Sequence, residues 1–84
     1  MNYKLSGLVY NEIIAREVCS LLENLAPKPL GSGFTELCEK EKIWEVDIYF
    51  NYKPDLSVKL LLEKIYETEF LITKIQHKIQ RIMR

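Results

Sequence analysis

The stretch Gly31-Ser32-Gly33 has the composition of a phosphate-binding turn, so it is the first candidate for chemistry in this 84-residue chain. Such a turn places a phosphate at the N-terminus of the helix that follows it, and nucleotide-binding turns carry a further glycine a few residues later. Positions 35 and 36 are Thr35 and Glu36, and the sequence after them is typical of a strand. The glycines are therefore predicted to form a flexible loop, and no cofactor is predicted.

Glu45 and Asp47 are the second candidate, because two neighbouring carboxyl groups can act as a general acid and a general base. Alternate residues of a strand share one face and lie about 7 Å apart. The surrounding sequence offers no apolar pocket that would raise the pKa of one carboxyl group, as acid and base chemistry requires. The sequence favours a solvated strand face over a catalytic pair.

His77 is the only histidine, and no acidic residue follows Glu69, so no carboxylate close in the sequence could orient it as a general base. A metal site would have to combine His77 with Cys19 and Cys38, which lie in three separate predicted elements without the short ligand spacing of zinc sites. In a chain expected to be cytosolic, the two cysteines are interpreted as reduced core thiols. No catalytic residue and no metal site are predicted.

The charges of the chain cancel overall, but they are unevenly distributed. Twelve basic and twelve acidic residues give no reason to expect a nucleic-acid or membrane partner. The acidic residues all lie between Glu12 and Glu69, whereas the last nine residues carry only positive charges. The sequence contains neither an apolar run of about 18 residues nor a leader pattern, so a cytoplasmic location is expected. One domain is predicted over residues 1–75, followed by a basic C-terminal tail over residues 76–84.

The first half of the chain predicts a strand and a helix. Residues 3–10 carry apolar residues at every second position, which predicts a strand. Asn11 is a good N-cap for a helix of about four turns, which Pro27 and Pro29 would end. Five apolar residues at helical spacing are predicted to form its buried face: Ile14, Val18, Leu21, Leu22 and Leu25.

Residues 43–50 alternate strictly, and this pattern predicts a strand that is buried on one face. Its apolar phase holds Trp44, Val46, Ile48 and Phe50. Residues 34–39 are predicted to pair with it as the first arm of a hairpin that turns at residues 40–42. Because the apolar residues of that arm change phase, a bulge or a register shift is expected. Trp44 is interpreted as an anchor of the core.

Residues 55–75 are predicted to form a second helix and a final strand. The helix begins after Asp55 or Ser57, and its buried face is predicted to hold Val58, Leu61, Leu62 and Ile65. Residues 69–75 are β-branched and alternating, which favours a strand, with an extension of the second helix as the alternative. The order strand, helix, strand, strand, helix, strand predicts a ferredoxin-like α+β sandwich, an antiparallel sheet with both helices on one face.

RNA-recognition modules share this topology and stack bases on aromatic residues of the central strands. In this chain Trp44 and Phe50 belong to the buried phase, and Tyr49 shares its face with Glu45 and Asp47. Those two carboxylates would repel phosphate groups. Nucleic acid is therefore not the expected partner, and the fold alone does not define another.

The segment GFTELCEKEKIWEVDIYFNYKPDLSVKLLLEKI, residues 33–65, resembles the N-terminal domain of the methyltransferase that modifies large-subunit ribosomal protein eleven. The likeness rests on the Trp-Glu-Val strand that ends in Tyr-Phe, the Pro-Asp turn and the leucine-rich helix, and it extends over roughly residues 3–75. In that family this domain is ferredoxin-like and holds the ribosomal protein, whereas a separate Rossmann-like domain binds S-adenosylmethionine and transfers the methyl groups. No residue here matches the cofactor motif of that second domain, and the sequence departs from the family pattern after Ile75.

Two functions remain open at this point. The first is a non-catalytic protein-recognition domain, expected to be a truncated or split-gene product, whose partner is ribosomal protein eleven or a separately encoded catalytic chain. The second is a small ferredoxin-like regulatory domain that forms a homodimer through its sheet and binds RNA or a small ligand. A chain this short buries a limited share of its surface, so either kind of partner would add stability.

Overall fold

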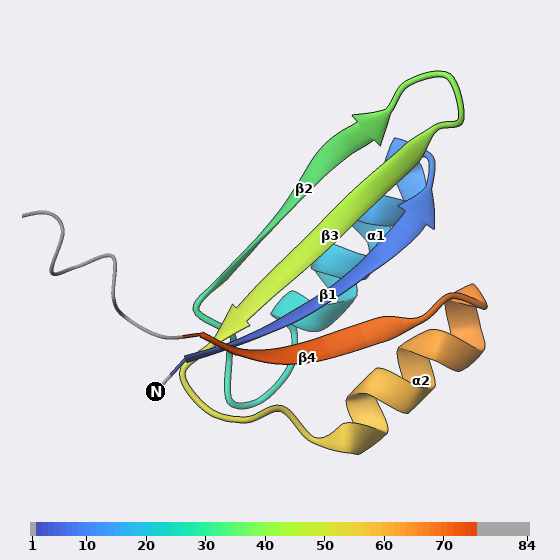
Figure 1. Ribbon diagram of the computed structural model, residues 1–84. Helices are drawn as coiled ribbons and strands as arrows, with labels where there is room; N and C mark the ends of the chain where they lie inside the picture. Colours follow the sequence, from blue (N-terminus) through green and yellow to red (C-terminus); the bar gives the residue numbers. More distant parts are fainter. Residues whose placement is uncertain (1, 76–84) are drawn as a thin grey trace, which may run out of the picture.

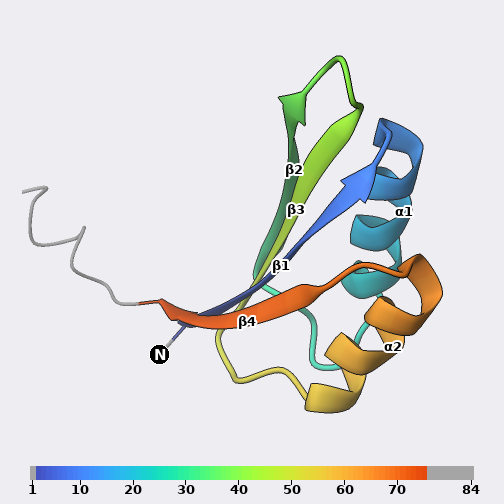
Figure 2. The same ribbon diagram turned by 45° about the vertical axis from the view of Figure 1, so that its right-hand side comes forward.

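The computed structural model describes residues 2–75 and contains the six elements in the predicted order. They are β1 (Asn2–Tyr10), α1 (Glu12–Glu23), β2 (Gly31–Cys38), β3 (Ile43–Phe50), α2 (Leu56–Tyr66) and β4 (Phe70–Ile75). The antiparallel sheet has the strand order β2-β3-β1-β4, and both helices lie on one side of it (Figures 1 and 2). The predicted ferredoxin-like α+β fold is confirmed. The predicted basic tail over residues 76–84, with His77, lies outside the described residues.

The strand register confirms two details of the sequence pattern. β1 occupies the centre of the sheet, where Leu5 pairs with Ile48 of β3 and with Ile72 of β4. The pairing of β2 with β3 shifts its register between Glu36 and Cys38, at the predicted irregularity. The final segment is the strand β4 and not an extension of the second helix.

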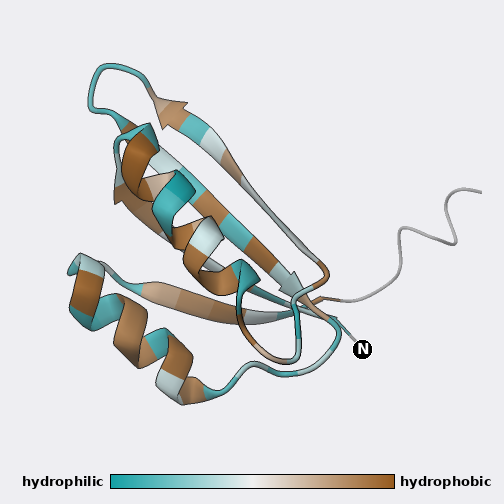
Figure 3. Cartoon of the chain, turned by 180° about the vertical axis from the view of Figure 1, so that it is seen from behind, coloured by the Kyte–Doolittle hydropathy of each residue, from teal (hydrophilic) through white to brown (hydrophobic). Residues whose placement is uncertain are grey.

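The core lies between the sheet and the helices. Its fully buried side chains come from every strand except β2 and from both helices, with Phe50 and Phe70 the largest of them. Figure 3 shows apolar residues alternating along the strands beneath α1. Trp44 lies on the predicted face of β3 but is only half-buried, with its ring centroid 5.7 Å from that of Phe34. Phe50 and Phe70 are therefore the anchors of the core, and Trp44 packs at its margin.

Gly7 allows Phe70 to reach this core. A Cβ atom at position 7 would lie 2.6 Å from Cδ2 and 2.6 Å from Cε2 of the Phe70 ring, far inside van der Waals contact. Gly7 is paired with Phe70 in the register of β1 and β4. The glycine that weakens the β1 sequence pattern is thus a packing requirement of the neighbouring strand.

Helix α1 begins where the sequence predicts and ends earlier. The Asn11 side chain caps it by accepting a 3.0 Å hydrogen bond from the backbone N–H of Ile14. The helix ends at Glu23 after 12 residues, so it is shorter than the predicted four turns and Leu25 lies beyond it. Leu21 is exposed, and the prediction that it is buried is wrong, because Ala15 and Cys19 fill the inner face of α1 instead.

Helix α2 is capped by Asp55, whose carboxylate accepts a 2.9 Å hydrogen bond from the N–H of Ser57. Leu62 is its one fully buried residue, whereas Leu61 is 54% exposed and Ile65 is 50% exposed. The prediction that Leu61 and Ile65 face the core is therefore wrong. The reason is that α2 packs against the edge strand β4, so only a narrow stripe of the helix finds partners, and apolar segments remain on its outer surface (Figure 3).

Two side chains of α2, Glu63 and Tyr66, form hydrogen bonds with other elements. Glu63 lies 2.7 Å from the ammonium group of Lys59 and accepts a 2.9 Å hydrogen bond from the backbone N–H of Phe70, at the start of β4. Tyr66 donates a 2.8 Å hydrogen bond to Glu17 of α1, and burial together with that carboxylate raises the pKa of Tyr66 to about 12. Within residues 2–75, neither helix has the length and apolar composition that crossing a membrane would need.

Candidate functional site

The helices leave one side of the sheet uncovered, and this side does not contribute to the core. Side chains alternate between the two faces of each strand, so the residues that precede and follow the core residues point away from the helices. We call this surface the open face and define it by six side chains and two glycines: Lys4, Leu8, Glu45, Asp47, Tyr49, Leu71, Gly31 and Gly33.

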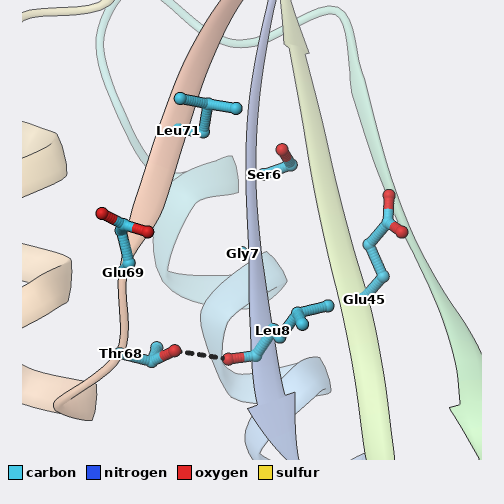
Figure 4. Close-up of a pocket in the computed structure, with 7 residues that line it drawn as sticks. All are labelled: Ser6, Gly7, Leu8, Glu45, Thr68, Glu69 and Leu71. Atoms are coloured by element: carbon cyan, nitrogen blue, oxygen red, sulfur yellow. Dashed lines mark hydrogen bonds between the residues drawn. The ribbon is translucent and has the colours of Figure 1, made fainter.

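The apolar part of the open face lies on β1 and β4. Leu71 is 61% exposed and Leu8 is 46% exposed. Both line a surface hollow of about 320 Å³, together with Ser6, Glu45 and the segment that leads into β4. Figure 4 shows this hollow, with Leu71 on one side of β1 and Glu45 on the other. Exposed leucines beside a hollow are typical of a surface that contacts another molecule.

Thr68 closes one end of the hollow. Its hydroxyl donates a 2.9 Å hydrogen bond to the backbone oxygen of Leu8, drawn as a dashed line in Figure 4. The contact extends the connection between β1 and the β4 segment beyond Gly7 and Phe70, the last residues that pair. This hydrogen bond connects the segment before β4 to β1 at the rim of the hollow.

Glu45 and Asp47 lie on this face together, as their spacing predicts. Asp47 is half-buried, and its Oδ1 atom is buried without a hydrogen-bond partner among the described residues. Burial raises the pKa of Asp47 to about 6, the neighbouring Glu45 acts in the same direction, and the positive charge of Lys4 opposes them. The expectation that nothing would raise a carboxyl pKa here is therefore wrong for Asp47.

Asp47 lies between two neighbouring strands of the sheet. Asp47 pairs with Ser6 of β1 and with Gly33 of β2, so its carboxyl group lies over the middle of the sheet. The β3 sequence alone contains no signal for this environment, because the neighbours come from positions 41 residues before it and 14 residues before it. The environment of the Asp47 carboxyl group follows from the register of β3 with its two neighbouring strands.

Gly31 and Gly33 lie in β2, and the prediction of a flexible loop is wrong. Gly31 pairs with Tyr49 and Gly33 pairs with Asp47, so both belong to the sheet ladder. Neither glycine has a positive φ angle, and a Cβ atom at either position would meet nothing within 4 Å. The two residues form a stretch of strand without side chains beside Asp47 and Tyr49, and they lie before a strand and not before a helix.

The two cysteines occupy separate elements, as predicted. Cys19 is buried in α1, with its thiol 3.8 Å from the backbone oxygen of Gly33, and Cys38 is half-buried at the end of β2. Burial raises the pKa of Cys19, which keeps its thiol protonated near neutral pH. His77, the third residue considered for a metal, lies outside the described residues. Within residues 2–75, no group of three or more histidine, cysteine or acidic side chains is arranged to hold a metal ion.

Comparisons with known proteins returned no match: no family model matches the chain, and neither a curated protein nor a solved structure does so. The resemblance to the methyltransferase domain therefore stays a prediction from the sequence. What the described residues offer is a sheet surface with exposed leucines, a tyrosine and two neighbouring carboxylates, and the charge of Lys4 acts on one of these carboxylates, Asp47. Such a surface can bind another molecule by apolar contact and by attraction of positive charge.

Proposed function

We propose that this chain is a non-catalytic protein-recognition domain that binds a basic protein through the open face of its sheet. The observation that carries the proposal is the combination of exposed apolar side chains, Leu8 and Leu71, with the carboxylates Glu45 and Asp47 on one surface. Apolar side chains supply the contact area of protein interfaces, and uncompensated charge of one sign selects partners of the other sign.

The resemblance seen in the sequence suggests which basic protein to test. In the methyltransferase family it points to, the equivalent domain holds large-subunit ribosomal protein eleven, and we propose the same partner here, encountered in the cytoplasm. The carboxylates on the open face support a basic protein over RNA as the ligand, because Glu45 and Asp47 lie where an RNA-binding sheet would need neutral or positive groups.

The test is a titration of the isotopically labelled chain with purified ribosomal protein eleven, followed by amide NMR. We expect the amide signals of β1, β3 and β4 to shift, with the largest changes around Leu8 and Leu71. The double variant Leu8→Ser with Leu71→Ser is expected to bind at least ten times more weakly, because two apolar contacts are lost. Unchanged spectra up to millimolar ribosomal protein would overturn the proposed partner.

Leu60 provides the matched control. It is 53% exposed on α2, on the opposite side of the sheet, so Leu60→Ser removes the same kind of side chain from a surface that the proposal does not use. We expect Leu60→Ser to bind like the original chain. If Leu60→Ser weakens binding and the open-face variant does not, the helical side is the interface and the proposal is wrong.

The non-catalytic part of the proposal has its own test. The chain is incubated with S-adenosylmethionine and ribosomal protein eleven, and transferred methyl groups are counted by mass spectrometry. We expect no transfer, because no residue matches the family's cofactor motif. Turnover by the purified chain would contradict this part, whereas sedimentation as a dimer that dissociates on Leu8→Ser would favour the homo-oligomeric alternative for the open face.

A further inference from the structure

The two glycines of β2 are not explained by the fold. Glycine weakens a strand, because it has the largest conformational freedom to lose and no side chain to pack. Gly7 has a reason to be glycine, since the Phe70 ring occupies the space of its Cβ atom. At Gly31 and Gly33 the backbone has no positive φ angle and the space is empty, so neither conformation nor internal packing excludes a larger residue.

Glycine inside a strand also marks places where another molecule approaches the backbone closely. Gly31 and Gly33 lie two residues apart on the open face, so together they form a bare strip of sheet, defined here as the surface over these two residues. Tyr49 borders the strip at Gly31, and Asp47 borders it at Gly33. The strip is therefore open to a side chain that lies flat on the sheet.

At the Asp47 end of the strip, negative charge exceeds positive charge among the described residues. Within the described part of the chain, the Oδ1 atom of Asp47 is buried without a hydrogen-bond donor, and Glu45 adds a second carboxylate on the same face. Among the described residues, the charged and titratable groups near Asp47 are Lys4 from β1, Glu45 and Tyr49 from β3, and Cys19 from α1, whereas β2 contributes Gly33 and Thr35, which do not titrate. Within residues 2–75, Lys4 is the one positive charge that acts on Asp47 against the two carboxylates, so a further positive charge would be attracted here.

We propose that the bare strip receives a lysine or arginine side chain of the protein partner. The aliphatic stem would lie over Gly31 and Gly33 beside the Tyr49 ring, and the cationic group would contact the carboxylate of Asp47. Long basic side chains combine an apolar stem with a charged end, which matches an aromatic border at one end of the strip and a carboxylate at the other. This inference rests on the proposed function, because it names the chemistry that the open face recognises in its basic partner.

The strip also makes recognition sensitive to acid. With a pKa of about 6, the Asp47 carboxyl group is ionised at pH 7.5 and mostly protonated at pH 5. Binding of a cationic side chain favours the ionised form, so affinity is expected to fall as the pH drops through about 6. We expect a decrease of roughly tenfold between pH 7.5 and pH 5, and a smaller pH dependence in Asp47→Asn.

The first experiment uses small probes and does not require the partner. The labelled chain is titrated at pH 7.5 with N-acetyl-lysine methylamide and N-acetyl-arginine methylamide, and with N-acetyl-norleucine methylamide as the uncharged control. We expect the cationic probes to shift the amide signals of Gly31, Gly33 and Asp47, whereas norleucine leaves them unchanged. Equal shifts with norleucine, or cationic shifts elsewhere on the molecule only, would overturn the inference.

Gly33→Val is the decisive variant, because its side chain would fill the strip at a position where the fold has space. Thr73→Val is the control, which places a valine at an exposed position of β4, opposite Lys4 in the register. We expect Gly33→Val to weaken binding of the cationic probes at least tenfold and Thr73→Val to have no effect. Binding that Gly33→Val leaves unchanged would overturn the inference.

The same variant separates this inference from the proposed function. If ribosomal protein eleven binds the original chain and Gly33→Val equally, the strip is not used and only the further inference fails. If the cationic probes bind the strip but ribosomal protein eleven does not bind the chain, the proposed partner fails and the strip remains a receptor for a basic side chain.

Discussion

The two faces of the sheet use the same strands for different purposes, and the difference is visible residue by residue along β1 and β3. On the helix side, Leu5, Val46 and Ile48 are fully buried and belong to the hydrophobic core. At adjacent positions of the same strands, Lys4 and Asp47 carry charges on the open face. Because the covered face holds the fold together, the side chains of the open face are free to serve a partner.

Gly7 and Gly33 show the same contrast between the covered face and the open face. Gly7 is required by the Phe70 ring on the covered face, whereas Gly33 lies on the open face with free space above it. A glycine that packing requires and a glycine that packing does not require look identical in the sequence. The difference between the two faces can therefore be tested by substitutions. Their effects on the free energy of unfolding should differ in size and in sign.

The largest effect is expected for Phe70→Ala on the covered face. Phe70 is fully buried, and its removal should lower the free energy of unfolding by about 3 to 5 kcal/mol through lost burial and a residual cavity. That is a large part of the stability of a small domain, so the variant is expected to be partly unfolded at 25 °C. Urea denaturation followed by circular dichroism measures the difference. A loss below about 1 kcal/mol would mean that the covered face is not the core.

The second prediction compares two glycine substitutions. Gly7→Ala should lower the free energy of unfolding by about 1 to 3 kcal/mol, because the new methyl group overlaps the buried Phe70 ring. Gly33→Ala should leave stability unchanged or raise it by up to about 1 kcal/mol, since alanine reduces the freedom of the unfolded chain and meets no atom. Thermal unfolding of both variants under one condition tests the difference. Equal destabilisation would contradict the assignment of the two glycines to different faces.

Much of this contrast could be predicted from the sequence, because alternation is a local property. The strict period of residues 43–50 predicts which side chains of β3 face the helices, and Val46, Ile48 and Phe50 are buried as that period requires. Asn11 and Asp55 mark helix starts because capping depends on residues within one turn. Local periodicity and capping were therefore sufficient for the order of the elements and the fold class.

The remaining features depend on contacts between segments that are distant in the sequence. Such contacts cannot be inferred from local sequence patterns. Leu61 and Ile65 have the spacing of a buried helical face, but α2 covers an edge strand and leaves them half-exposed. Gly31 and Gly33 have the composition of a loop, but pairing with Tyr49 and Asp47 extends β2 through them. The pKa of Asp47 likewise depends on neighbouring strands. The candidate site was therefore missed where it depends on register.

The third prediction concerns the pH dependence of stability that Asp47 contributes. Its pKa is raised from 3.8 to about 6 in the folded chain, so the folded state binds more protons than the unfolded state between about pH 4 and pH 6. The contribution of Asp47 to stability is present below about pH 4 and is lost as the pH rises through about 6. Asp47→Asn should therefore be more stable than the original chain by about 1 kcal/mol at pH 7.5, a value reduced by solvent screening of a partly exposed group.

Urea denaturation of both chains at pH 7.5 and pH 4 measures this difference. At pH 4 the Asp47 carboxyl group is protonated in the folded state, so the two free energies of unfolding should approach each other. A stability difference that stays constant over this range would show that the carboxyl group is well solvated, and that the open face lacks the desolvated carboxyl group argued for it.

The smallest effect on stability is expected for Leu71→Ser. This variant allows a direct comparison with Phe70→Ala, because the two residues are adjacent in β4. Leu71 adjoins Phe70 in β4 but points to the open face and is 61% exposed, so it contributes little to the core. We expect its replacement to change the free energy of unfolding by less than about 0.5 kcal/mol, as is usual at exposed positions. If Phe70→Ala lowers the free energy of unfolding several times more than Leu71→Ser does, the two neighbouring residues lie on different faces. One face then stabilises the fold, and the other is available for binding. A loss of more than about 2 kcal/mol at Leu71 would instead place this residue among the core contacts and remove it from the proposed interface.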